Sequence, residues 1–523
     1  MINKSKLFLI VLIVFMALCV NSTHASDGAE YSDYIKVGLK WPLKSQESFK
    51  LRSEGGFVFG RLSNNFDEIG YINNEELDVT LDGSKKGPYH IILEEKSDSL
   101  EEVQKIIEKF KQSDIESFLY FDENINIGVG NYKSLEAAQK DYDIIKDYIG
   151  EATIINGSNK LINFIDSNGD SIILINKSSD IHFKAINENT YLQVEDRHYR
   201  DFLKVTSNNN KIIPVVVTDI NNYLYGVVPR EISASWPIEA VKAQAVAARN
   251  FTLYNLDRHS HEGYDLCDTV HCQVFGGVDY EKERSNIAVD ETKNITIKYN
   301  GRIIPAYYHS NSGGQTANSE NIWSAKVPYL RGVKDEFSVG APNSNWTYNV
   351  STRDLNDKLR EEGIDIGSVV SIEPIEISEN NRVVKLLVVG TNGKKVLEKE
   401  KIRRILGTSN LKSIWYKVKT NSDVYVIDGK NNKPMKASLT ESSIITGRDV
   451  ISNRSSNTIN NIVNVISKDD KKRMNYTPEV FTFEGKGWGH GLGMSQWGAK
   501  KMAELGYTFE EILEHYYSGT IVE

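Results

Sequence analysis

The stretch from Asn221 to Asn255 constrains the fold most, because two backbone patterns meet there around one carboxylate. It reads NNYLYGVVPREISASWPIEAVKAQAVAARNFTLYN. The alternation over residues 223–228 predicts a strand, and the apolar spacing over residues 238–252 predicts a helix. Pro229 has no amide proton to give to a ladder, so it should end the strand. We therefore expect Glu231 on a strand-to-helix turn.

The surroundings of Glu231 permit a catalytic role. The predicted helix contains five alanines between residues 240 and 248, so another backbone can approach it closely and its position should be fixed. Ile232 and Trp236 are apolar neighbours that could remove water from the Glu231 carboxylate and raise its pKa, as a general acid at neutral pH requires. A solvated carboxylate on a turn is the competing interpretation.

The first 25 residues have the pattern of a secretory signal peptide. Lys4 and Lys6 precede an apolar run from residue 7 to residue 20, and Thr23-His24-Ala25 is a small-x-small cleavage site. The run is short for a membrane span of about 20 residues, and an uncleaved signal anchor is the alternative. We expect an exported protein at the cell wall or the extracytoplasmic face of the membrane.

The composition is that of a globular protein with several domains and argues against nucleic-acid binding. With 523 residues, of which 40% are hydrophobic and 25% charged, the chain should form two to four ordinary globular domains. The formal net charge of -9 argues against a nucleic-acid partner, which would require a basic surface.

The predicted fold class is α+β, with several domains. After the signal peptide we expect a strand-rich segment over residues 26–85 and a small domain over residues 86–157. Residues 158–523 should form a mixed α/β catalytic core that carries a strand-rich insertion at about residues 345–480.

The small domain has the order β-α-β-β-α-β of a ferredoxin-like unit, with helices at residues 100–110 and 135–148, and we expect it to fold alone. Residues 127–139, IGVGNYKSLEAAQ, resemble the second half of the sporulation-related repeat (SPOR) domain. The resemblance implies binding of peptidoglycan glycan strands that lack stem peptides. An unrelated α+β spacer is the alternative.

A second cluster combines thiols and imidazoles. The segment HEGYDLCDTVHCQVFGG contains His261, Cys267, His271 and Cys272, and two thiolates with two imidazoles would form a tetrahedral zinc site. The Cys-x4-Cys spacing is not a common zinc-finger spacing. A disulfide between Cys267 and Cys272 is the alternative in an exported protein.

Two polar, glycine-bearing segments could hold a sugar. Residues 307–316, YYHSNSGGQT, follow a predicted strand, and residues 485–498, GKGWGHGLGMSQWG, precede a predicted helix. Trp488 and Trp497 are natural platforms for pyranose rings. A capped turn with solvent-facing polar groups is the alternative for the first segment, and the second lacks the G-x4-G-K-[ST] pattern of a phosphate-binding loop.

Four blocks together resemble the SpoIID family, also called the amidase-enhancer or LytB family. They read PREISASWPIEAVKAQAVAARNF, CDTVHCQVFGG, AYYHSNSGGQTANSENIW and GKGWGHGLGMSQWGAKKMAELG, in that order. The resemblance implies a lytic transglycosylase with Glu231 as its catalytic residue. It also implies a structural zinc ion near the cleft, held by Cys267 and Cys272 with His261 or His271.

The resemblance further implies peptidoglycan as the substrate, cleaved in wall remodelling or sporulation, and a cell-wall amidase and other cell-wall or engulfment proteins as partners. The expected sugar contacts are Tyr308, His309, Ser310, Ser312, Gln315, Thr316, His490, Ser495 and Gln496. Two other functions compete with catalysis. One is a non-catalytic wall-binding enhancer of an N-acetylmuramoyl-L-alanine amidase, and the other is a structural, adhesin-like surface protein.

Overall fold

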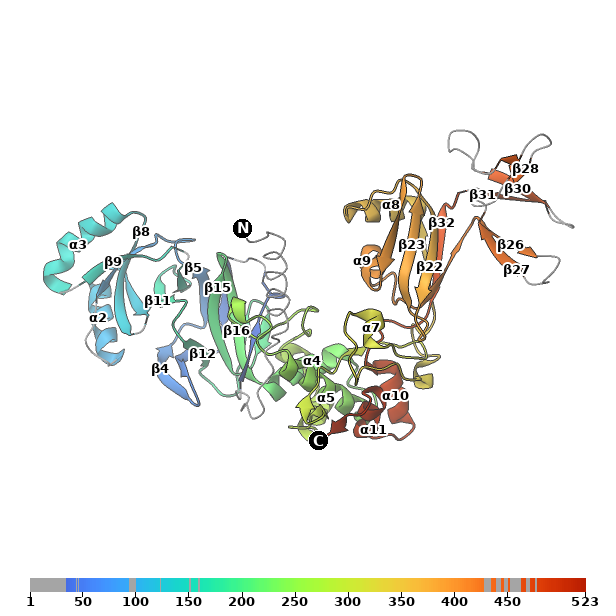
Figure 1. Cartoon of the computed structure of the whole chain (residues 1–523). Helices are drawn as coiled ribbons and strands as arrows, with labels where there is room; N and C mark the ends of the chain where they lie inside the picture. The colour runs from blue at the N-terminus through green and yellow to red at the C-terminus, as the bar shows by residue number, and fades with distance from the viewer. Residues whose placement is uncertain are drawn as a thin grey trace, which may run out of the picture.

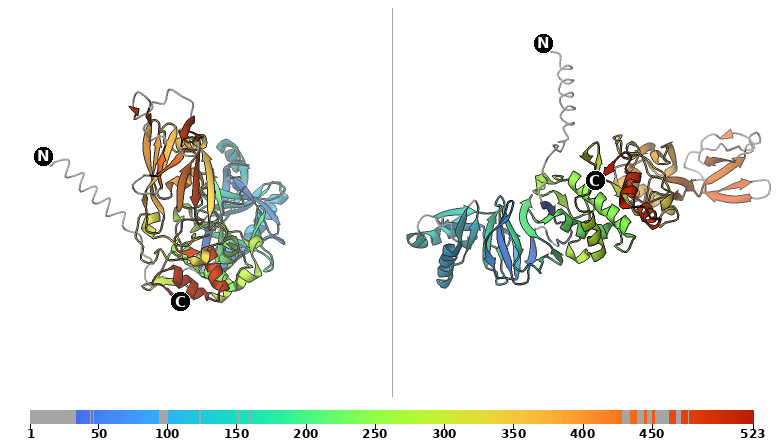
Figure 2. Two further views of the ribbon diagram at one scale, coloured as in Figure 1. Left: turned by 90° about the vertical axis from the view of Figure 1, so that its right-hand side faces the viewer. Right: turned by 90° about the horizontal axis from the view of Figure 1, so that it is seen from below.

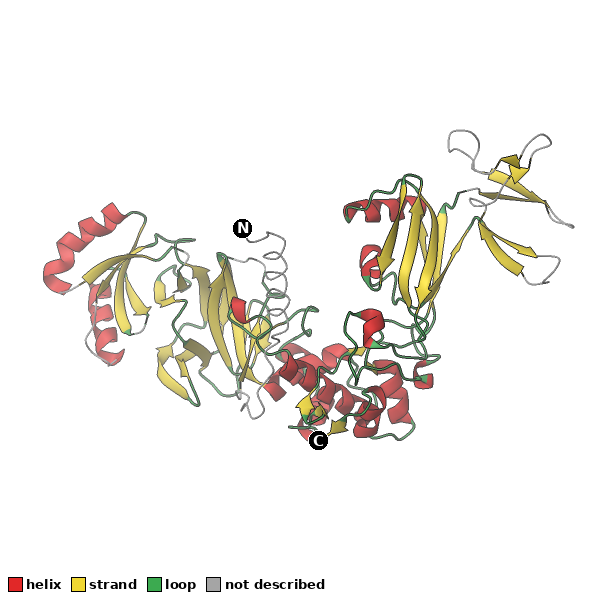
Figure 3. Cartoon of the chain, viewed as in Figure 1, coloured by secondary structure: helices red, strands yellow, loops and turns green. Residues whose placement is uncertain are grey.

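The computed structural model describes residues 34–43, 45, 47–93, 100–122, 124–149, 152–158, 160–427, 434–438, 444–445, 450–451, 462–466, 471–475 and 477–523. The predicted signal peptide lies outside these residues. Two sheet-rich arms extend from a central group of helices (Figures 1 and 2), and Figure 3 shows this central group between the arms as well as further helices that lie on the sheets of each arm. Within the described part of the chain, no helix is long and apolar enough to cross a membrane.

Two sheets form the N-terminal arm. The strand order of the first is β17-β1-β16-β15-β12-β3-β4, and that of the second is β14-β13-β2-β5-β10-β11-β7-β8-β6-β9. The first sheet contains β1 (Tyr34–Gly38), β3 (Phe57–Leu62), β4 (Phe66–Ile72), β12 (Ile181–Ala185), β15 (Phe202–Asn208), β16 (Lys211–Asp219) and β17 (Leu266–Cys267). The second contains β2 (Ser48–Arg52), β5 (Glu76–Leu81), β6 (Tyr89–Leu93), β7 (Ser117–Phe121), β8 (Ile125–Tyr132), β9 (Ala152–Asn156), β10 (Leu161–Ile165), β11 (Ser171–Asn176), β13 (Leu192–Val194) and β14 (Arg197–Tyr199).

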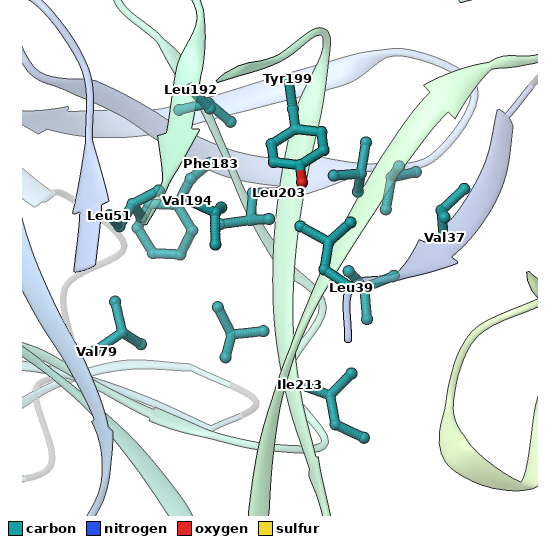
Figure 4. Close-up of a cluster of buried hydrophobic side chains, with 14 of the residues drawn as sticks. Val37, Leu39, Leu51, Val79, Phe183, Leu192, Val194, Tyr199, Leu203 and Ile213 are labelled. Atoms are coloured by element: carbon teal, nitrogen blue, oxygen red, sulfur yellow. The ribbon is translucent and has the colours of Figure 1, made fainter. Parts of the chain in front are cut away.

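The core of this arm lies between the two sheets. Figure 4 shows Val37, Leu203 and Ile213 of the first sheet gathered with Leu51 and Val79 of the second. All five side chains are buried. The alternation of buried and partly exposed positions along β2 fits a strand with one face on the core. The two sheets therefore share one hydrophobic core.

The predicted β-α-β-β-α-β order is observed at residues 89–156, with helices α2 (Leu100–Gln112) and α3 (Leu135–Ile149). Strand β6 pairs antiparallel with β8 and β9, and β7 pairs antiparallel with β8. The unit is not separate, however, because β7 also pairs in parallel with β11. Strands from the predicted segments 26–85 and 158–523 share both sheets. An edge strand needs a partner or a cover, and here the surrounding sheet supplies it.

The strand predicted at residues 223–228 is wrong. Residues Ile220–Glu231 form helix α4, whose N-cap Asp219 accepts a hydrogen bond from the amide of Asn221 at 2.7 Å. The buried side chains of this segment follow a helical spacing: Tyr223, Leu224, Val227 and Val228. Aromatic and aliphatic residues alternate there, but both kinds are apolar, so the alternation carried no strand signal.

The central helices surround α5 (Ile238–Tyr254), which contacts α4, α6, α10 and α11. The five alanines of α5 are buried, which fits the expected close approach of other segments. The other elements of this part are η1 (Ser260–Glu262), η2 (Val278–Tyr280), α6 (Glu283–Glu291), β18 (Ile297–Tyr299), β19 (Arg302–Ile303), β20 (Tyr308–His309), α7 (Ser319–Ile322), η3 (Glu336–Ser338), β33 (Met494–Ser495), α10 (Gln496–Glu504), α11 (Phe509–Tyr516) and β34 (Ile521–Val522).

The second arm is the predicted insertion, and it has a hydrophobic core of its own. Strands β21 (Trp346–Ser351) and β25 (Tyr416–Thr420) both pair with β32 (Val480–Gly485), so the arm begins and ends in one sheet. It also contains α8 (Thr352–Glu361), β22 (Val369–Ile377), β23 (Val383–Gly390), β24 (Gly393–Glu398) and α9 (Lys401–Leu406). Three hairpins follow: β26 (Asp423–Ile427) with β27 (Pro434–Ser438), β28 (Ile444–Ile445) with β29 (Val450–Ile451), and β30 (Ile462–Ile466) with β31 (Lys471–Asn475).

Candidate active site and metal-ligand cluster

Glu231 is the last residue of α4 and is partly exposed. Removal of water from its surroundings raises the pKa of the Glu231 carboxyl from 4.5 to about 7, although a hydrogen bond from Tyr308 and the positive charge of Arg230 both oppose the increase. A carboxyl with this pKa is protonated in a large fraction of molecules at neutral pH. It can therefore give a proton and then accept one.

The end of α4 is fixed by close packing against the segment that follows the two cysteines. The amide of Gly276 donates a hydrogen bond of 3.0 Å to the carbonyl of Gly226. A Cβ atom on Gly226 would lie 2.7 Å from the ring of Phe275, which is closer than packed carbon atoms can come. Glycine at position 226 therefore lets α4 approach this segment, and Glu231 is held at the end of that helix.

A buried relay of hydrogen bonds supports the Tyr308 hydroxyl. The side-chain amide of Gln273 donates to the hydroxyl oxygen of Tyr308 at 3.1 Å, while the side-chain oxygen of Gln273 accepts from Thr252 at 2.9 Å and from Tyr223 at 3.4 Å. Because these two hydroxyls fix which end of the amide points to Tyr308, the Tyr308 hydroxyl is left to donate to Glu231. Gln273 is thus a positioning residue for the carboxyl.

Polar and aromatic side chains lie on another side of Glu231. The side-chain amide of Gln496 reaches the carbonyl oxygen of Glu231 at 3.5 Å and the side-chain oxygen of Gln244 at 3.2 Å. The rings of Trp236 and Trp497 lie 4.9 Å apart. Trp497 directly follows Gln496 in the chain, and a pair of indoles offers an apolar surface on which a sugar ring can pack.

The ligand atoms of His259, Cys267, His271 and Cys272 all lie within 4.8 Å of one another. The Cys272 sulfur is 3.4 Å from Nε2 of His259 and 3.6 Å from Nδ1 of His271. Both cysteines are free thiols rather than a disulfide. A hydrogen bond from the Cys272 thiol lowers the pKa of Cys267, which favours a thiolate there. Two sulfur and two nitrogen donors at these separations are the set that tetrahedral zinc prefers.

The structure brings His259 into this cluster in place of the predicted His261. The side chain of His261 is 73% exposed and is not part of the cluster, whereas His259 is buried. A carboxylate oxygen of Glu262 lies 2.7 Å from Nδ1 of His259, so the proton sits on Nδ1 and Nε2 is free to bind a metal. Such carboxylate–histidine pairs are the usual outer layer of a zinc site.

Strand β20 and the glycine-rich loop pack together, and this contact accounts for several of the predicted sugar contacts. Strand β20 pairs in parallel with β33, and Asn311 forms a two-way backbone bridge with Trp488. A Cβ atom on Gly489 would lie 2.6 Å from Cβ of His309. The glycines therefore let this loop approach the strand rather than a ligand.

Most of the side chains that were predicted to bind sugar form hydrogen bonds within the protein instead. The hydroxyl of Ser312 donates to Asp335 at 2.6 Å, and that of Ser495 accepts from the amides of Ser312 and Gly498. Thr316 accepts from the amide of Val333 at 2.8 Å. These side chains hold the loops in place.

The six remaining predicted contacts divide into three pairs. Nδ1 of His309 is bonded to the carbonyl of Leu492 at 3.1 Å, while Nδ1 of His490 accepts from the Leu492 amide at 3.0 Å. Burial lowers the pKa of both imidazoles, so they are neutral at pH 7. Ser310 and Gln315 are partly exposed. Tyr308 and Gln496 are the predicted residues that the structure brings to Glu231.

Comparison with known proteins supports a relationship to the SpoIID family. Residues 208–299 match the model of that family, described as stage II sporulation protein, and residues 340–432 match a domain of unknown function (DUF8618). The chain is similar to the amidase enhancer of Bacillus subtilis (strain 168), with 32% identity over 306 residues. That match covers 57% of this chain and 40% of the relative, so it spans less than half of the relative's length.

Two further relatives are covered more fully. Stage II sporulation protein D of Bacillus subtilis (strain 168) is 27% identical over 316 residues, which are 58% of this chain and 73% of that protein. An uncharacterised protein of Brachyspira hyodysenteriae is 29% identical over 312 residues, covering 60% and 68% of the two chains. The names of the relatives refer to sporulation and to the enhancement of an amidase.

Proposed function

We propose that this protein is an exported lytic transglycosylase that cleaves peptidoglycan glycan strands lacking stem peptides. The bond broken joins N-acetylmuramic acid to N-acetylglucosamine, and the product carries a 1,6-anhydro-muramic end. The setting is cell-wall remodelling or sporulation.

The proposal rests on one observation: the carboxyl group of Glu231 has its pKa raised to about 7. Among the described residues, no second carboxylate shifts the pKa of Glu231 or is bonded to its side chain. Ordinary glycosidases need a pair of carboxylates, one of which acts on water or on the sugar. A transglycosylase needs one group that is first an acid and then a base, because the attacking hydroxyl belongs to the substrate.

In the first step, protonated Glu231 gives its proton to the glycosidic oxygen, and the bond from that oxygen to C1 of the muramic acid breaks. In the second step, the Glu231 carboxylate takes the proton from the C6 hydroxyl of the same sugar while O6 bonds to C1. The carboxyl returns to its protonated form. The hydrogen bond from Tyr308 supports the carboxylate between the two steps.

The substrate contacts follow from the exposed groups around Glu231. We assign sugar packing to Trp236 and Trp497, and hydrogen bonding to Gln496 and Ser310. Ser312 and Thr316 are assigned a structural role, since their hydroxyls are buried and bonded within the protein.

We also propose that His259, Cys267, His271 and Cys272 hold a zinc ion with a structural role. When bound, zinc would crosslink the segment on which Gln273 lies, because Gln273 follows Cys272 directly. Catalysis itself is assigned to Glu231, which the hydrogen bonds from Gln273 to Tyr308 and from Tyr308 to Glu231 hold in position.

The unit at residues 86–157 is proposed to bind glycan, on its resemblance to the SPOR domain. Deleting it would expose the edge of β11, which pairs with β7, so point variants are the better test. Leu135 and Ile144 on α3 are exposed apolar side chains. Changing both to serine should weaken glycan binding if α3 carries the contact, and unchanged binding would argue that it does not.

A second function is supported by the relative named amidase enhancer. In that case the protein would bind the wall and stimulate a separate amidase, without cutting glycan. The two functions separate when purified protein is incubated with peptide-stripped glycan and, in parallel, an amidase is assayed on intact peptidoglycan. Anhydro ends that disappear in Glu231→Gln support catalysis. Amidase stimulation that persists in Glu231→Gln, without anhydro ends in the wild type, supports the enhancer.

A further inference from the structure

Two arginines from different parts of the chain share one indole beside Glu231. The guanidinium carbon of Arg197 lies 3.6 Å from the ring centre of Trp41, and that of Arg230 lies 4.8 Å from the same centre. Arg230 also lies 4.2 Å from the ring centre of Tyr280. Trp41 is 40% exposed, so the cluster is open to solvent. We call Trp41, Arg197, Arg230 and Tyr280 the arginine–indole cluster.

The cluster is held in place by the backbone around Trp41. The amides of Lys40 and Trp41 donate to the carboxylate of Asp268 at 2.8 and 3.0 Å. Asp268 is fully buried and follows Cys267, a member of the metal-ligand cluster. Trp41 is thereby anchored to the metal-ligand segment.

A second pair of contacts fixes Arg197 against Tyr280. Strand β14, which carries Arg197, packs on η2, which carries Tyr280. The His198 amide and ring each bond to Asp279 at 2.8 Å, and Arg200 forms a two-point ion pair with Glu281 at 2.7 and 2.8 Å. The side chains next to the cluster on both elements are thus paired.

Arg197 and Arg230 themselves lack such partners. Among the described residues, neither guanidinium forms an ion pair with a carboxylate, and the buried Nη1 of Arg197 has no hydrogen-bond partner. Packing on an aromatic ring leaves the N–H donors of a guanidinium free for a planar anion. In a chain with a net charge of -9, two neighbouring arginines whose guanidinium groups form no ion pair with a carboxylate are suited to hold an anion.

The cluster adjoins the proposed acid, since Arg230 directly precedes Glu231 and its charge acts on that carboxyl. Trp41 and Arg197 lie outside residues 208–299, which match the SpoIID model. The N-terminal sheets therefore add side chains to the edge of the site.

We infer that Arg197 and Arg230 bind the free lactyl carboxylate of N-acetylmuramic acid, while the rings of Trp41 and Tyr280 hold the two guanidinium groups in place. The inference rests on the proposed function for its substrate class. In intact peptidoglycan this carboxylate is tied up as an amide to the stem peptide. The cluster would thus select glycan from which an amidase has already removed the peptides, because guanidinium groups bind carboxylates as bidentate, charge-assisted pairs.

The test compares two forms of one ligand. The Glu231→Gln variant of the full chain is titrated with peptide-stripped glycan, and with the same glycan after its carboxyls have been converted to methylamides. We expect binding to the free acid to be about tenfold tighter, as one or two charge-assisted hydrogen bonds supply. Arg230→Gln and Arg197→Gln, each added to Glu231→Gln, should remove this preference. Arg302→Gln, which removes an exposed arginine on β19, should leave it unchanged.

Equal affinity of Glu231→Gln for the two glycans would overturn the inference, as would a preference that survives in Arg230→Gln. Arg230 is exposed, so its variant should fold even if Arg197→Gln does not. The proposed function fails independently of this result: a tenfold preference for the acid, together with a wild type that makes no anhydro ends, keeps the carboxylate site and rejects the transglycosylase.

Discussion

Replacing Tyr308 by phenylalanine is the sharpest test of how the carboxyl of Glu231 is tuned. The change removes one oxygen and keeps the ring. In the structure, the Tyr308 hydroxyl stabilises the charged form of Glu231 and lowers its pKa, against the larger effect of lost solvation. Without that hydroxyl the pKa should rise further above 7. Because Glu231 acts first as an acid, activity should then persist to higher pH.

The size of the shift follows from the strength of one hydrogen bond to a charged group, about 1.5–3 kcal/mol. One pKa unit corresponds to about 1.4 kcal/mol, so full loss would raise the pKa by about one to two units. Glu231 is partly exposed, and water will replace part of the lost bond. We therefore expect the alkaline limb of the pH profile to move from about 7 to about 8.

The assay is the rate of anhydro-muramic end formation between pH 5 and pH 9, with each profile scaled to its own plateau. At pH 8 the wild type should retain about a tenth of its plateau rate and Tyr308→Phe about half. Tyr307→Phe is the matched control, because it removes the same atom from the adjacent residue and should leave the limb in place. A limb that stays at about 7 in Tyr308→Phe, or moves to lower pH, would refute the assigned hydrogen bond.

Three further outcomes are expected. Gln273→Leu removes the donor that orients the Tyr308 hydroxyl, so kcat should fall about tenfold with zinc content unchanged; an unaltered kcat would remove Gln273 from the relay. Because the folded-state pKa of Glu231 is raised from 4.5 to about 7, its ionisation destabilises the fold as pH rises between these values, by at most about 3.5 kcal/mol. Glu231→Gln should therefore melt several degrees above the wild type at pH 8 but not at pH 4, and equal differences at both pH values would contradict the loss of solvation assigned to Glu231. His259→Ala should lose the bound zinc measured by metal analysis while His261→Ala keeps it, and the reverse result would restore His261 as the ligand.

The helices and turns were largely predictable because their signals are local. The helices expected at residues 100–110 and 135–148 are observed as α2 and α3, each extended by one or two residues. The Asn300-Gly301 turn joins β18 and β19 with both residues at positive φ, as a two-residue hairpin requires. These helices and turns depend on residues that are close together in the sequence, so the sequence alone predicts them.

The arrangement of the sheets was not predictable in the same way. Strand β1 pairs with β16, far along the chain, and β11 joins the edge of β7. Apolar strands such as these fit many partners, and only the completed core selects one. The strand expected at residues 223–228 failed for a related reason, because a segment that is apolar on every side does not reveal its period.

In the site, the residue types predicted which groups are reactive, but they did not predict which atoms each side chain contacts. The cysteines and Glu231 carry reactive groups, so sequence alone marked them. Serines and threonines in a polar loop are ambiguous, since a hydroxyl serves a sugar or a neighbouring backbone equally well, and the bonds of Ser312 and Ser495 fall within the protein. His259 lies two residues before His261, and the sequence does not distinguish which of the two histidines faces the thiols. Gln273 carries no local signal beyond following Cys272.

The most direct measurement of the central claim is the mass of the products released from peptide-stripped glycan. A lytic transglycosylase leaves 1,6-anhydro-muramic ends, each lighter by one water than the end a hydrolase would leave. Wild-type protein should yield these ends, and Glu231→Gln should yield none above the buffer control. No anhydro ends from the wild type, or equal amounts from Glu231→Gln, would contradict the account of Glu231 as the acid and base.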